Sequence, residues 1–379
     1  MAMHSAHIAT RRRWPFIAVV MVAIVAGLWI ALWYYASAKV EATIAGWRER
    51  EAKIGRVYTC ATQTIGGFPF GIDVRCSDPG VELRSSQPPA ALKWKDLHVT
   101  ASLFTPTRLV SEYTGPLMIG EPGRPPSVVA NWRQAQTAVR GLPTAPERMT
   151  TVFDDLTVDR LVGGGRENVF KARQVELTGR MVEGSAISNP VIELTLKMAG
   201  ATAPAVHPAA AAPLDADITA LLRGLKDFSP KPWPERFREI QAAGGRLEIM
   251  KARIQQGDVV TVATGGLGLT PRGRLDGELR MTVANFEKLL STLGLDRFIS
   301  RQTASGGQLD SALGALDRLL PGLGNVARQN AGPAVVAGLG LLGQPAELEG
   351  KRAVMLPLRF TDGLASLGPI PLGPTPPLF

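Results

Sequence analysis

The pattern of apolar and polar residues divides the chain into two unlike parts. Residues 16–35 form a run of 20 positions without a charged side chain, whereas most of the later sequence alternates between apolar and polar residues over short stretches. A helix rises about 1.5 Å per residue, so the run spans about 30 Å, the thickness of a bilayer's hydrocarbon core. The pattern predicts a transmembrane anchor over residues 14–38 and then a juxtamembrane helix over residues 39–56.

The residues that flank this run indicate its orientation. A basic cluster directly precedes it: Arg11, Arg12 and Arg13. The positive-inside rule puts such a cluster in the cytoplasm, so we expect residues 1–13 to form a cytoplasmic tail and the main domain to lie on the other side. Aromatic residues near both predicted membrane surfaces fit an interfacial belt. They are Trp14 on one side, and Trp29, Trp33, Tyr34 and Tyr35 on the other.

A cleaved secretory signal is the alternative explanation for the run. Residues 36–38 (Ala-Ser-Ala) resemble a small-residue cleavage site, but the apolar region of a signal peptide is usually about 7–15 residues long. The site also follows a bulky aromatic cluster, and a helical pattern continues after it. The uncleaved anchor is favoured, and a buried core helix is disfavoured by the flanking charges. With either the uncleaved anchor or the cleaved signal, the rest of the chain is expected to be exported.

Strand-like alternation fills a first β-rich half over residues 57–200 and a second over residues 214–362, and an Ala/Pro-rich loop at 201–213 joins them. Gly, Pro and Asp separate the runs, which is typical of an antiparallel sheet with one covered face. The predicted strands are 57–60, 72–76, 81–84, 92–100, 108–113, 116–119, 127–132, 136–141, 151–159, 170–178, 191–198, 246–254, 259–269, 275–283 and 353–360.

Helical spacing interrupts the second half. We predict helices over residues 217–225, 234–241 and 286–295, and further helical segments over 309–320 and 333–342. A Pro/Gly-rich tail, residues 363–379, is expected to be loosely ordered. The predicted fold class is α+β, mainly β: an N-terminal transmembrane helix followed by a large twisted antiparallel sheet with a few helices packed on it.

The two cysteines of the chain, Cys60 and Cys76, both follow the anchor. An even number of cysteines in an exported region predicts a disulfide. A Gly/Pro turn lies midway between them and consists of Gly66, Gly67, Phe68, Pro69 and Phe70. A hairpin folded there, with flanking strands at 57–60 and 72–76, would bring the cysteines opposite each other. No Cys or His neighbours either cysteine, so no metal is expected there.

Net charge narrows the possible partners only modestly. The chain carries +9, and removing the three cytoplasmic arginines leaves +6 on the exported part. These charges are scattered, so nucleic acid is not an expected partner. Anionic lipid, an anionic polysaccharide or simply a solvated surface fit the charge equally well.

No set of residues matches a catalytic, metal or cofactor site. His98 lies on a predicted strand and is expected to face solvent, and no Ser, His and Asp set has hydrolase spacing. Gly163–165 with Arg166 lacks the end of a phosphate loop and predicts a hairpin turn. Asp154, Asp155 and Asp159 lack the spacing of a calcium loop and predict a solvated turn into a strand.

The aromatic residues of the first half admit two interpretations. Trp94, Trp132, Phe153 and Phe170 occur at strand spacing. Aromatic residues at such positions are most often ordinary sheet core, which is the favoured interpretation. The alternative is that they line a groove for lipid.

Two motifs point to a known family. The stretch 63–70 (Gln-Thr-Ile-Gly-Gly-Phe-Pro-Phe) between two cysteines, soon after an anchor and Trp47-Arg48, resembles the bacterial domain-of-unknown-function 2125 family, as do residues 360–363 (Phe-Thr-Asp-Gly) after the last strand. The resemblance covers nearly the whole chain and implies a cell-envelope protein without an assigned activity. The meander 245–283 and its following Leu-rich helix resemble the C-terminal module of AsmA-like envelope proteins, which implies a β-groove that carries lipid.

These patterns lead to one expected function and one alternative. We expect a single-pass protein of the inner (plasma) membrane with a periplasmic main domain, which is non-enzymatic and binds or conducts phospholipid along a β-groove. The alternative is a scaffold that docks other envelope proteins and has no ligand groove.

Overall fold

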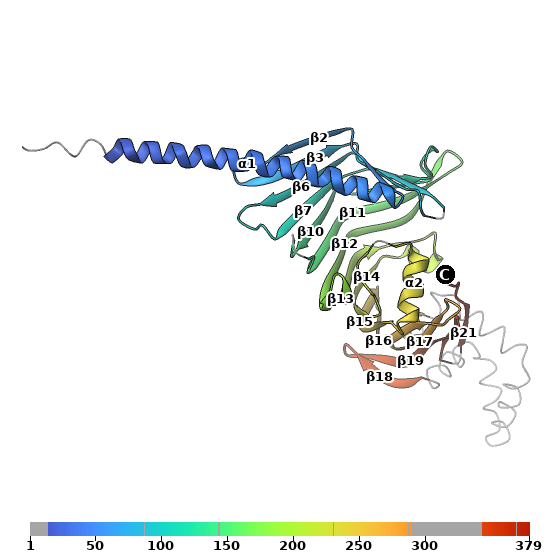
Figure 1. Cartoon of the computed structure of the whole chain (residues 1–379). Coiled ribbons are helices and arrows are strands. Elements are labelled where there is room, and N and C mark those ends of the chain that lie inside the picture. Colours follow the sequence, from blue (N-terminus) through green and yellow to red (C-terminus); the bar gives the residue numbers. More distant parts are fainter. Residues whose placement is uncertain are drawn as a thin grey trace, which may run out of the picture.

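The computed structural model describes residues 14–379 apart from 87, 143–144, 230, 287, 290–342 and 369. Its N-terminal element is α1 (Trp14–Lys53), an unbroken helix of 40 residues. It is long and apolar enough to cross a membrane. About half of α1 projects away from the rest of the protein, and the other half lies along the sheet (Figure 1). The predicted anchor and juxtamembrane helix are thus one continuous helix.

The rest of the described chain is dominated by a single connected sheet in which every strand pair is antiparallel. The strands are β1 (Arg56–Thr59), β2 (Thr62–Gly66), β3 (Gly71–Ser77), β4 (Gly80–Leu83), β5 (Ala90–Lys93), β6 (Asp96–Ser102), β7 (Arg108–Thr114), β8 (Leu117–Gly120), β9 (Val128–Asn131), β10 (Gln134–Arg140), β11 (Arg148–Val162), β12 (Gly165–Ser185), β13 (Ser188–Ala201), β14 (Leu214–Leu222), β15 (Arg246–Gln256), β16 (Val259–Leu269), β17 (Leu275–Ala284), β18 (Gln344–Leu348), β19 (Lys351–Thr361), β20 (Leu364–Leu367) and β21 (Ile370–Pro374).

The sheet forks at β11. One half of β11 pairs with β10, which begins the branch β10–β7–β6–β3–β2. The other half pairs with β9, which begins the branch β9–β8–β5–β4–β1. The branches end at β1 and β2, which are consecutive in the chain and both contact α1. Beyond β11 the strands follow in order to β17 and then β19, and Figure 1 shows the sheet curling away from α1 along this direction.

Two clusters of buried apolar side chains lie at the far end of the sheet from α1. Val283, Phe286, Leu356 and Leu367 form one buried cluster, in which the residues are at most 5% exposed. A second cluster joins Val260, Ala284 and Ala353. These residues come from β16, β17, β19, β20 and the helix that begins at Phe286, so the last strands enclose a compact apolar core.

One predicted helix is a strand. Residues 217–225 were expected to be helical, but β14 (Leu214–Leu222) occupies this stretch and pairs with β13 and β15. The stretch also has the strand period, since Ala216, Ile218 and Ala220 alternate with polar residues. Pairing on both sides overrides the short apolar run that suggested a helix.

Two other features differ from the prediction. The expected strand 92–100 is broken at Trp94 and Lys95 into β5 and β6, which belong to different branches. The 363–379 tail is not loose, because β20 and β21 form a hairpin within it and the Leu378 amide donates to the Gly273 carbonyl. The Ala/Pro-rich loop matches its predicted bounds to within one residue, since β13 ends at Ala201 and β14 begins at Leu214, and it contains a 3₁₀ turn, η1 (Pro208–Ala211).

Two helical predictions are confirmed at least in part. α2 (Trp233–Ala242) matches the helix predicted over 234–241, and a helix begins at Phe286. The remainder of 286–295, and both 309–320 and 333–342, lie outside the described residues.

Candidate functional site

The sheet presents one continuous apolar face from β11 to β19. Residues that pair across antiparallel strands point to the same face, and apolar residues are paired to apolar residues through seven successive strands. One such row runs Leu177, Leu196, Ile218, Ala252, Ala263, Met281 and Leu356. A neighbouring row begins with Phe153 and Val175 and continues to Met198.

Much of this face remains open in its middle part. Leu177 is 47% exposed, Met149 49% and Ile254 38%, although each lies in a row of paired apolar residues. Exposed apolar side chains on one face of a sheet make that face a candidate binding surface.

The opposite face is charged and carries several ion pairs. Arg180 lies directly across from Glu193 and binds it at 2.9 Å, and Lys251 binds Asp217 at 2.8 Å. Near the far end, Arg359 binds Glu278 at 2.8 Å. Hydroxyl pairs continue the pattern between these ion pairs. The sheet therefore has one face suited to water and one suited to hydrocarbon.

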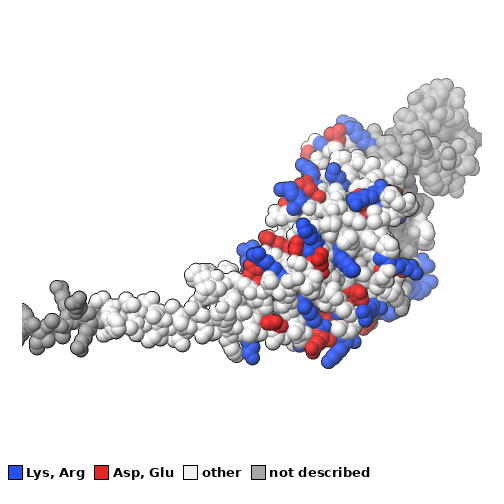
Figure 2. Space-filling view, turned by 90° about the horizontal axis from the view of Figure 1, so that it is seen from above, with Lys and Arg blue, Asp and Glu red and all other residues white. Residues whose placement is uncertain are grey.

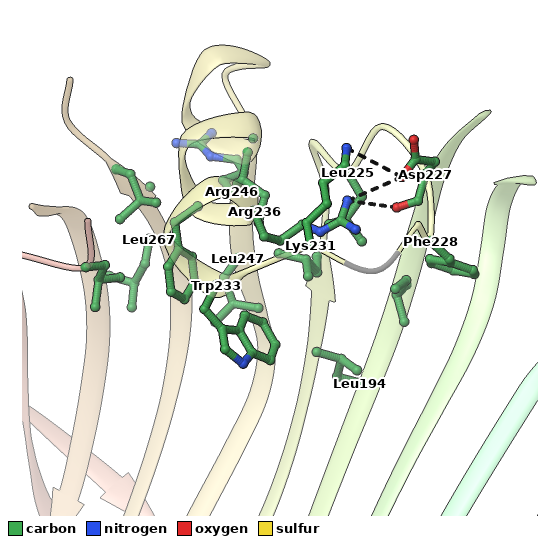
Figure 3. Close-up of a pocket in the computed structure, with 18 of the residues that line it drawn as sticks. Leu194, Leu225, Asp227, Phe228, Lys231, Trp233, Arg236, Arg246, Leu247 and Leu267 are labelled. Carbon is green, nitrogen blue, oxygen red and sulfur yellow. Dashed lines mark hydrogen bonds and ion pairs between the residues drawn. The ribbon is translucent and has the colours of Figure 1, made fainter. Parts of the chain in front are cut away.

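A pocket of about 590 Å³ lies where α2 covers part of the apolar face. The sheet side of the pocket consists of Ile192, Leu194, Leu222, Leu247 and Leu267, and α2 contributes Trp233, Phe237 and Ile240. Figure 3 shows Leu194, Leu247 and Leu267 on strands that run beneath Trp233. The pocket is the partly roofed end of the open apolar face.

Local sequence explains why a helix forms over this pocket. Pro232 occupies the N-cap position, Pro234 lies in the first turn and Glu235 complements the helix N-terminus. After the helix the chain passes close to the segment that follows β14: a Cβ on Gly245 would come within 2.4 Å of the Arg223 carbonyl oxygen. Glycine is required at this crossing for steric reasons.

A four-residue ion network closes one side of the pocket. Arg236 binds Glu239 at 2.7 Å and Asp227 at 3.6 Å, and Lys231 contacts both carboxylates. Figure 3 shows Lys231 and Arg236 converging on Asp227. All four side chains are 11–23% exposed. Two anions balance two cations, so the network ties the segment before α2 to the helix.

The network holds its carboxylates ionised. A side-chain hydrogen bond from Ser229 is the main cause that lowers the pKa of Asp227 to about 2. Burial raises the pKa of Glu239, but hydrogen bonds from Lys231, the Lys226 amide and Arg236 outweigh it and leave the pKa lowered. A carboxylate held this firmly ionised stabilises the fold and is poorly suited to general acid–base catalysis at neutral pH.

The predicted disulfide is present, with an S–S distance of 2.07 Å between Cys60 and Cys76. The predicted hairpin is correct in its turn but wrong in one strand. β2 (Thr62–Gly66) pairs with β3, whereas residues 57–59 belong to β1, which pairs with β4 in the other branch. The bond therefore links the junction between β1 and β2 to β3.

The predicted turn residues lie against α1. Gly66 ends β2, Gly67 adopts a left-handed conformation with φ of 99°, and the turn leads through Pro69 into β3. Phe68 and Phe70 are 50% and 57% exposed. The topology residues Arg11, Arg12 and Arg13 lie outside the described residues.

The structure also gives roles to His98 and to the glycines at 163–164, which the sequence offered as possible site residues. His98, expected to face solvent, is half-buried at 31% exposed and hydrogen-bonds Asp73 at 2.5 Å. Gly163 and Gly164 form the β11–β12 turn, as predicted.

The aspartates and aromatic residues differ from their predictions. Asp154 and Asp155 lie within β11, not in a turn before it, and pair with Arg133. The four aromatic residues predicted as core are half-buried. Trp132 packs edge-on against Phe153, with ring centroids 5.5 Å apart. No group of three metal-binding side chains occurs among the residues that the structure describes.

A comparison with protein families matches residues 33–376 to DUF2125, described as an uncharacterised protein conserved in bacteria. The chain belongs to the DUF2125 family. The match includes the second half of α1, both branches of the sheet and the last strands, so the apolar face lies wholly within the DUF2125 region. No curated protein matches the chain.

Sequence reasoning missed two features of this DUF2125 protein. Trp29 and Trp33, assigned to an aromatic belt, also donate hydrogen bonds to the turn between β2 and β3. Their spacing of four residues, which places both on one helix face, was the available signal. The ion network beside α2 was also missed, because its members are brought together by a loop with no regular period.

Proposed function

We propose that this protein is a non-enzymatic, membrane-anchored envelope protein that binds the acyl chains of phospholipid along the apolar face of its sheet. The observation that carries the proposal is the contrast between the two faces, since the exposed Leu177 lies on one and the paired Arg180 and Glu193 on the other. Each methylene group moved from water onto such a face contributes about 0.8 kcal/mol.

The pocket beneath α2 supports the same proposal. Its volume of about 590 Å³ lies within the range of small-molecule sites. Asp227, Lys231 and Arg236 are engaged with one another, and Ser229 donates to Asp227. Arg246 also lines the pocket, and the rest of the lining is mainly aliphatic and aromatic, which suits a hydrocarbon chain.

The face can be tested by photo-crosslinking at two positions on one strand. Leu177 lies on the apolar face of β12 and Gln174 on the charged face, and both are exposed. We expect a benzophenone side chain at Leu177 to crosslink radiolabelled phospholipid in membranes, and one at Gln174 to crosslink several-fold less. Equal labelling at the two positions would contradict the proposal.

A second test lowers the expected affinity for phospholipid by placing a charge in the pocket. Leu194→Arg puts a cation into the pocket lining, whereas Thr195→Arg puts the same side chain on the opposite face of β13. We expect protein extracted in mild detergent to retain less phospholipid for Leu194→Arg than for Thr195→Arg. Lipid around α1 is common to both variants, so the difference reports on the sheet.

The proposed orientation has its own test. The three arginines before α1 favour a cytoplasmic N-terminus and a periplasmic sheet. Alkaline phosphatase fused after Phe379 is expected to be active, because this enzyme needs an oxidising compartment. An inactive but stable fusion would place the sheet in the cytoplasm and would also remove the setting in which the disulfide forms readily.

Interaction with another envelope protein is the second candidate. It is favoured by the two outer strands at the far end: among the described strands, β18 pairs only with β19, and β21 only with β20. Unpaired strand edges can accept a strand from a partner. Crosslinking that recovers one stoichiometric partner through β18 or β21 would support this candidate.

A further inference from the structure

The turn between β2 and β3 lies beside the membrane-spanning part of α1. The Trp29 indole N–H donates to the Pro69 carbonyl at 3.0 Å, and the Trp33 indole N–H donates to the Gly71 carbonyl at 2.9 Å. The Trp33 ring also packs edge-on against Phe68, with centroids 5.6 Å apart. Three contacts from two tryptophans therefore hold the turn along this stretch of helix.

The position of these contacts along α1 indicates how deep in the bilayer the β2–β3 turn would lie. If the outer edge of the hydrocarbon core lies at Tyr35, the last residue of the aromatic cluster, Trp29 lies six residues, or about 9 Å, inside it. A hollow between the turn and α1 extends further along the helix and is lined by Met21, Val22, Val25, Ala26, Trp29, Pro69 and Phe70. A turn held at this level would be within the hydrocarbon core.

A second loop reaches the same place. Phe104, in the loop between β6 and β7, lies 5.6 Å from Phe70 between ring centroids, and the Leu103 amide donates to the Phe70 carbonyl. Phe104 is 76% exposed and Leu103 is 49% exposed. Together the β2–β3 turn (residues 66–71) and the β6–β7 loop (residues 102–107) form what we call the aromatic tip.

The aromatic tip has the composition expected of a membrane-inserted element. Neither of its segments contains Asp, Glu, Lys or Arg. The nearest charged residues along the chain are Asp73 and Arg108, which lie on the adjoining strands and line a hollow at the base of the tip. On the side of the molecule shown in Figure 2, the projecting part of α1 and the adjoining edge of the sheet carry no charged residue.

Several backbone groups of the tip also have hydrogen-bond partners within the protein, as a location inside a bilayer requires. Inside a bilayer each unsatisfied N–H or C=O costs several kcal/mol, so irregular chain needs internal partners. The carbonyls of Gly67, Pro69, Phe70 and Gly71 accept from the Gly71 amide, Trp29, Leu103 and Trp33. The Phe104 amide donates to the Ser102 hydroxyl, and proline at position 69 has no N–H to satisfy.

We propose that the aromatic tip inserts into the outer leaflet of the same bilayer that α1 crosses, with the acyl chains of phospholipid as its partner. The edge of the sheet that carries the tip then contacts the bilayer directly, and α1 is not its only attachment to the membrane. This inference does not depend on lipid binding along the apolar face, because the tip and the face are different parts of the sheet.

Fluorescence quenching in vesicles tests the insertion. A single cysteine is introduced as Phe104→Cys in the full-length protein, with the Cys60–Cys76 disulfide intact, and labelled with a nitrobenzoxadiazole fluorophore. The control is Ile187→Cys, at an 86% exposed apolar residue in the turn between β12 and β13. Both are reconstituted into phosphatidylcholine–phosphatidylglycerol vesicles that carry a nitroxide either at mid-acyl chain or on the head group.

Insertion predicts that mid-chain nitroxide quenches the Phe104 label several-fold more than the Ile187 label, and more than head-group nitroxide does. Aqueous iodide should show the opposite order between the two positions. Stronger quenching by the head group would mean that the tip rests on the surface, and equal iodide quenching would mean that it lies in water; either result overturns the proposal. If the Phe104→Cys protein does not fold, Leu103→Cys is judged by the same criteria.

Discussion

The two ends of the sheet are held together by different interactions. Near α1, strands β1 and β2 depend on half-buried aromatic contacts, such as Trp47 against Tyr58 at 4.4 Å between centroids, and on the disulfide. At the far end, Val283 and Leu356 are 0% and 3% exposed within a buried cluster. Between the ends, Leu177 is half exposed. Apolar residues continue along the whole face, so what distinguishes the regions is whether another element covers them.

The largest loss of folding stability is expected for a substitution in the buried cluster at the end of the sheet far from α1. Leu356→Ala should lower the free energy of unfolding by about 2–5 kcal/mol, because it leaves a cavity in a closely packed cluster. Thermal unfolding followed by circular dichroism in detergent would measure the difference. Leu177→Ala is the matched control and should cost less than about 1 kcal/mol, since its side chain is half exposed already. Equal effects would show that the middle of the face is covered in solution.

Removal of the disulfide should have a smaller effect, confined to the end near α1. Cys60→Ser with Cys76→Ser releases a loop of about 17 residues and is expected to cost about 3 kcal/mol from loop entropy. Hydrogen exchange should accelerate in β2 and β3 and remain unchanged in β17 and β19. Faster exchange throughout the sheet would mean that the two ends unfold as one unit.

Loss of an aromatic contact with α1 should cost still less. Trp47→Ala removes the ring that packs on Tyr58 and is expected to destabilise β1 by about 1–2 kcal/mol, because the ring is 40% exposed. Trp47→Phe keeps a ring at this position and should recover most of the loss. The measurement is hydrogen exchange in β1 and β4; a change in β19 instead would contradict the assignment of the contact to this end.

The smallest change in stability is expected when low pH protonates the carboxylates of the ion network beside α2. The lowered pKa values of Asp227, about 2, and Glu239 mean that the folded state binds their protons more weakly than the unfolded state does. Their contribution is therefore complete above the unfolded values and is lost as the pH falls through the folded ones. The thermal stability of the protein and of Asp227→Asn with Glu239→Gln should converge between about pH 5 and pH 2. A constant difference would argue against the ionised network.

Features encoded by local pattern were predictable from the sequence. The uncharged run gave the N-terminal helix, the meander 246–283 gave β15 to β17, and the two cysteines with their turn gave the disulfide. Each depends on residues close together in the chain or on a period that the fold preserves. The helix over 234–241 likewise had its start encoded by Pro234 and Glu235.

Features that depend on distant partners were not predictable. Residues 217–225 combine a short apolar run with strand alternation, and only pairing with β13 and β15 decides between helix and strand. The same is true of β1, whose partner is β4 and not the nearer β3. The apolar face itself needs the register of seven strand pairs, which no single stretch of sequence contains.

The helix α1 also fixes the rotational position of the β2–β3 hairpin about the helix axis. Trp33 binds Gly71 and Arg48 binds Gln63, so the same hairpin is clamped to the helix at two points 15 residues apart, or about 22 Å. One residue inserted between the clamps would rotate one relative to the other by about 100° and shift it by about 1.5 Å. Both clamps could not then close on one hairpin. The length of this stretch of helix therefore has to match the hairpin for the first strands of the sheet to pack against α1.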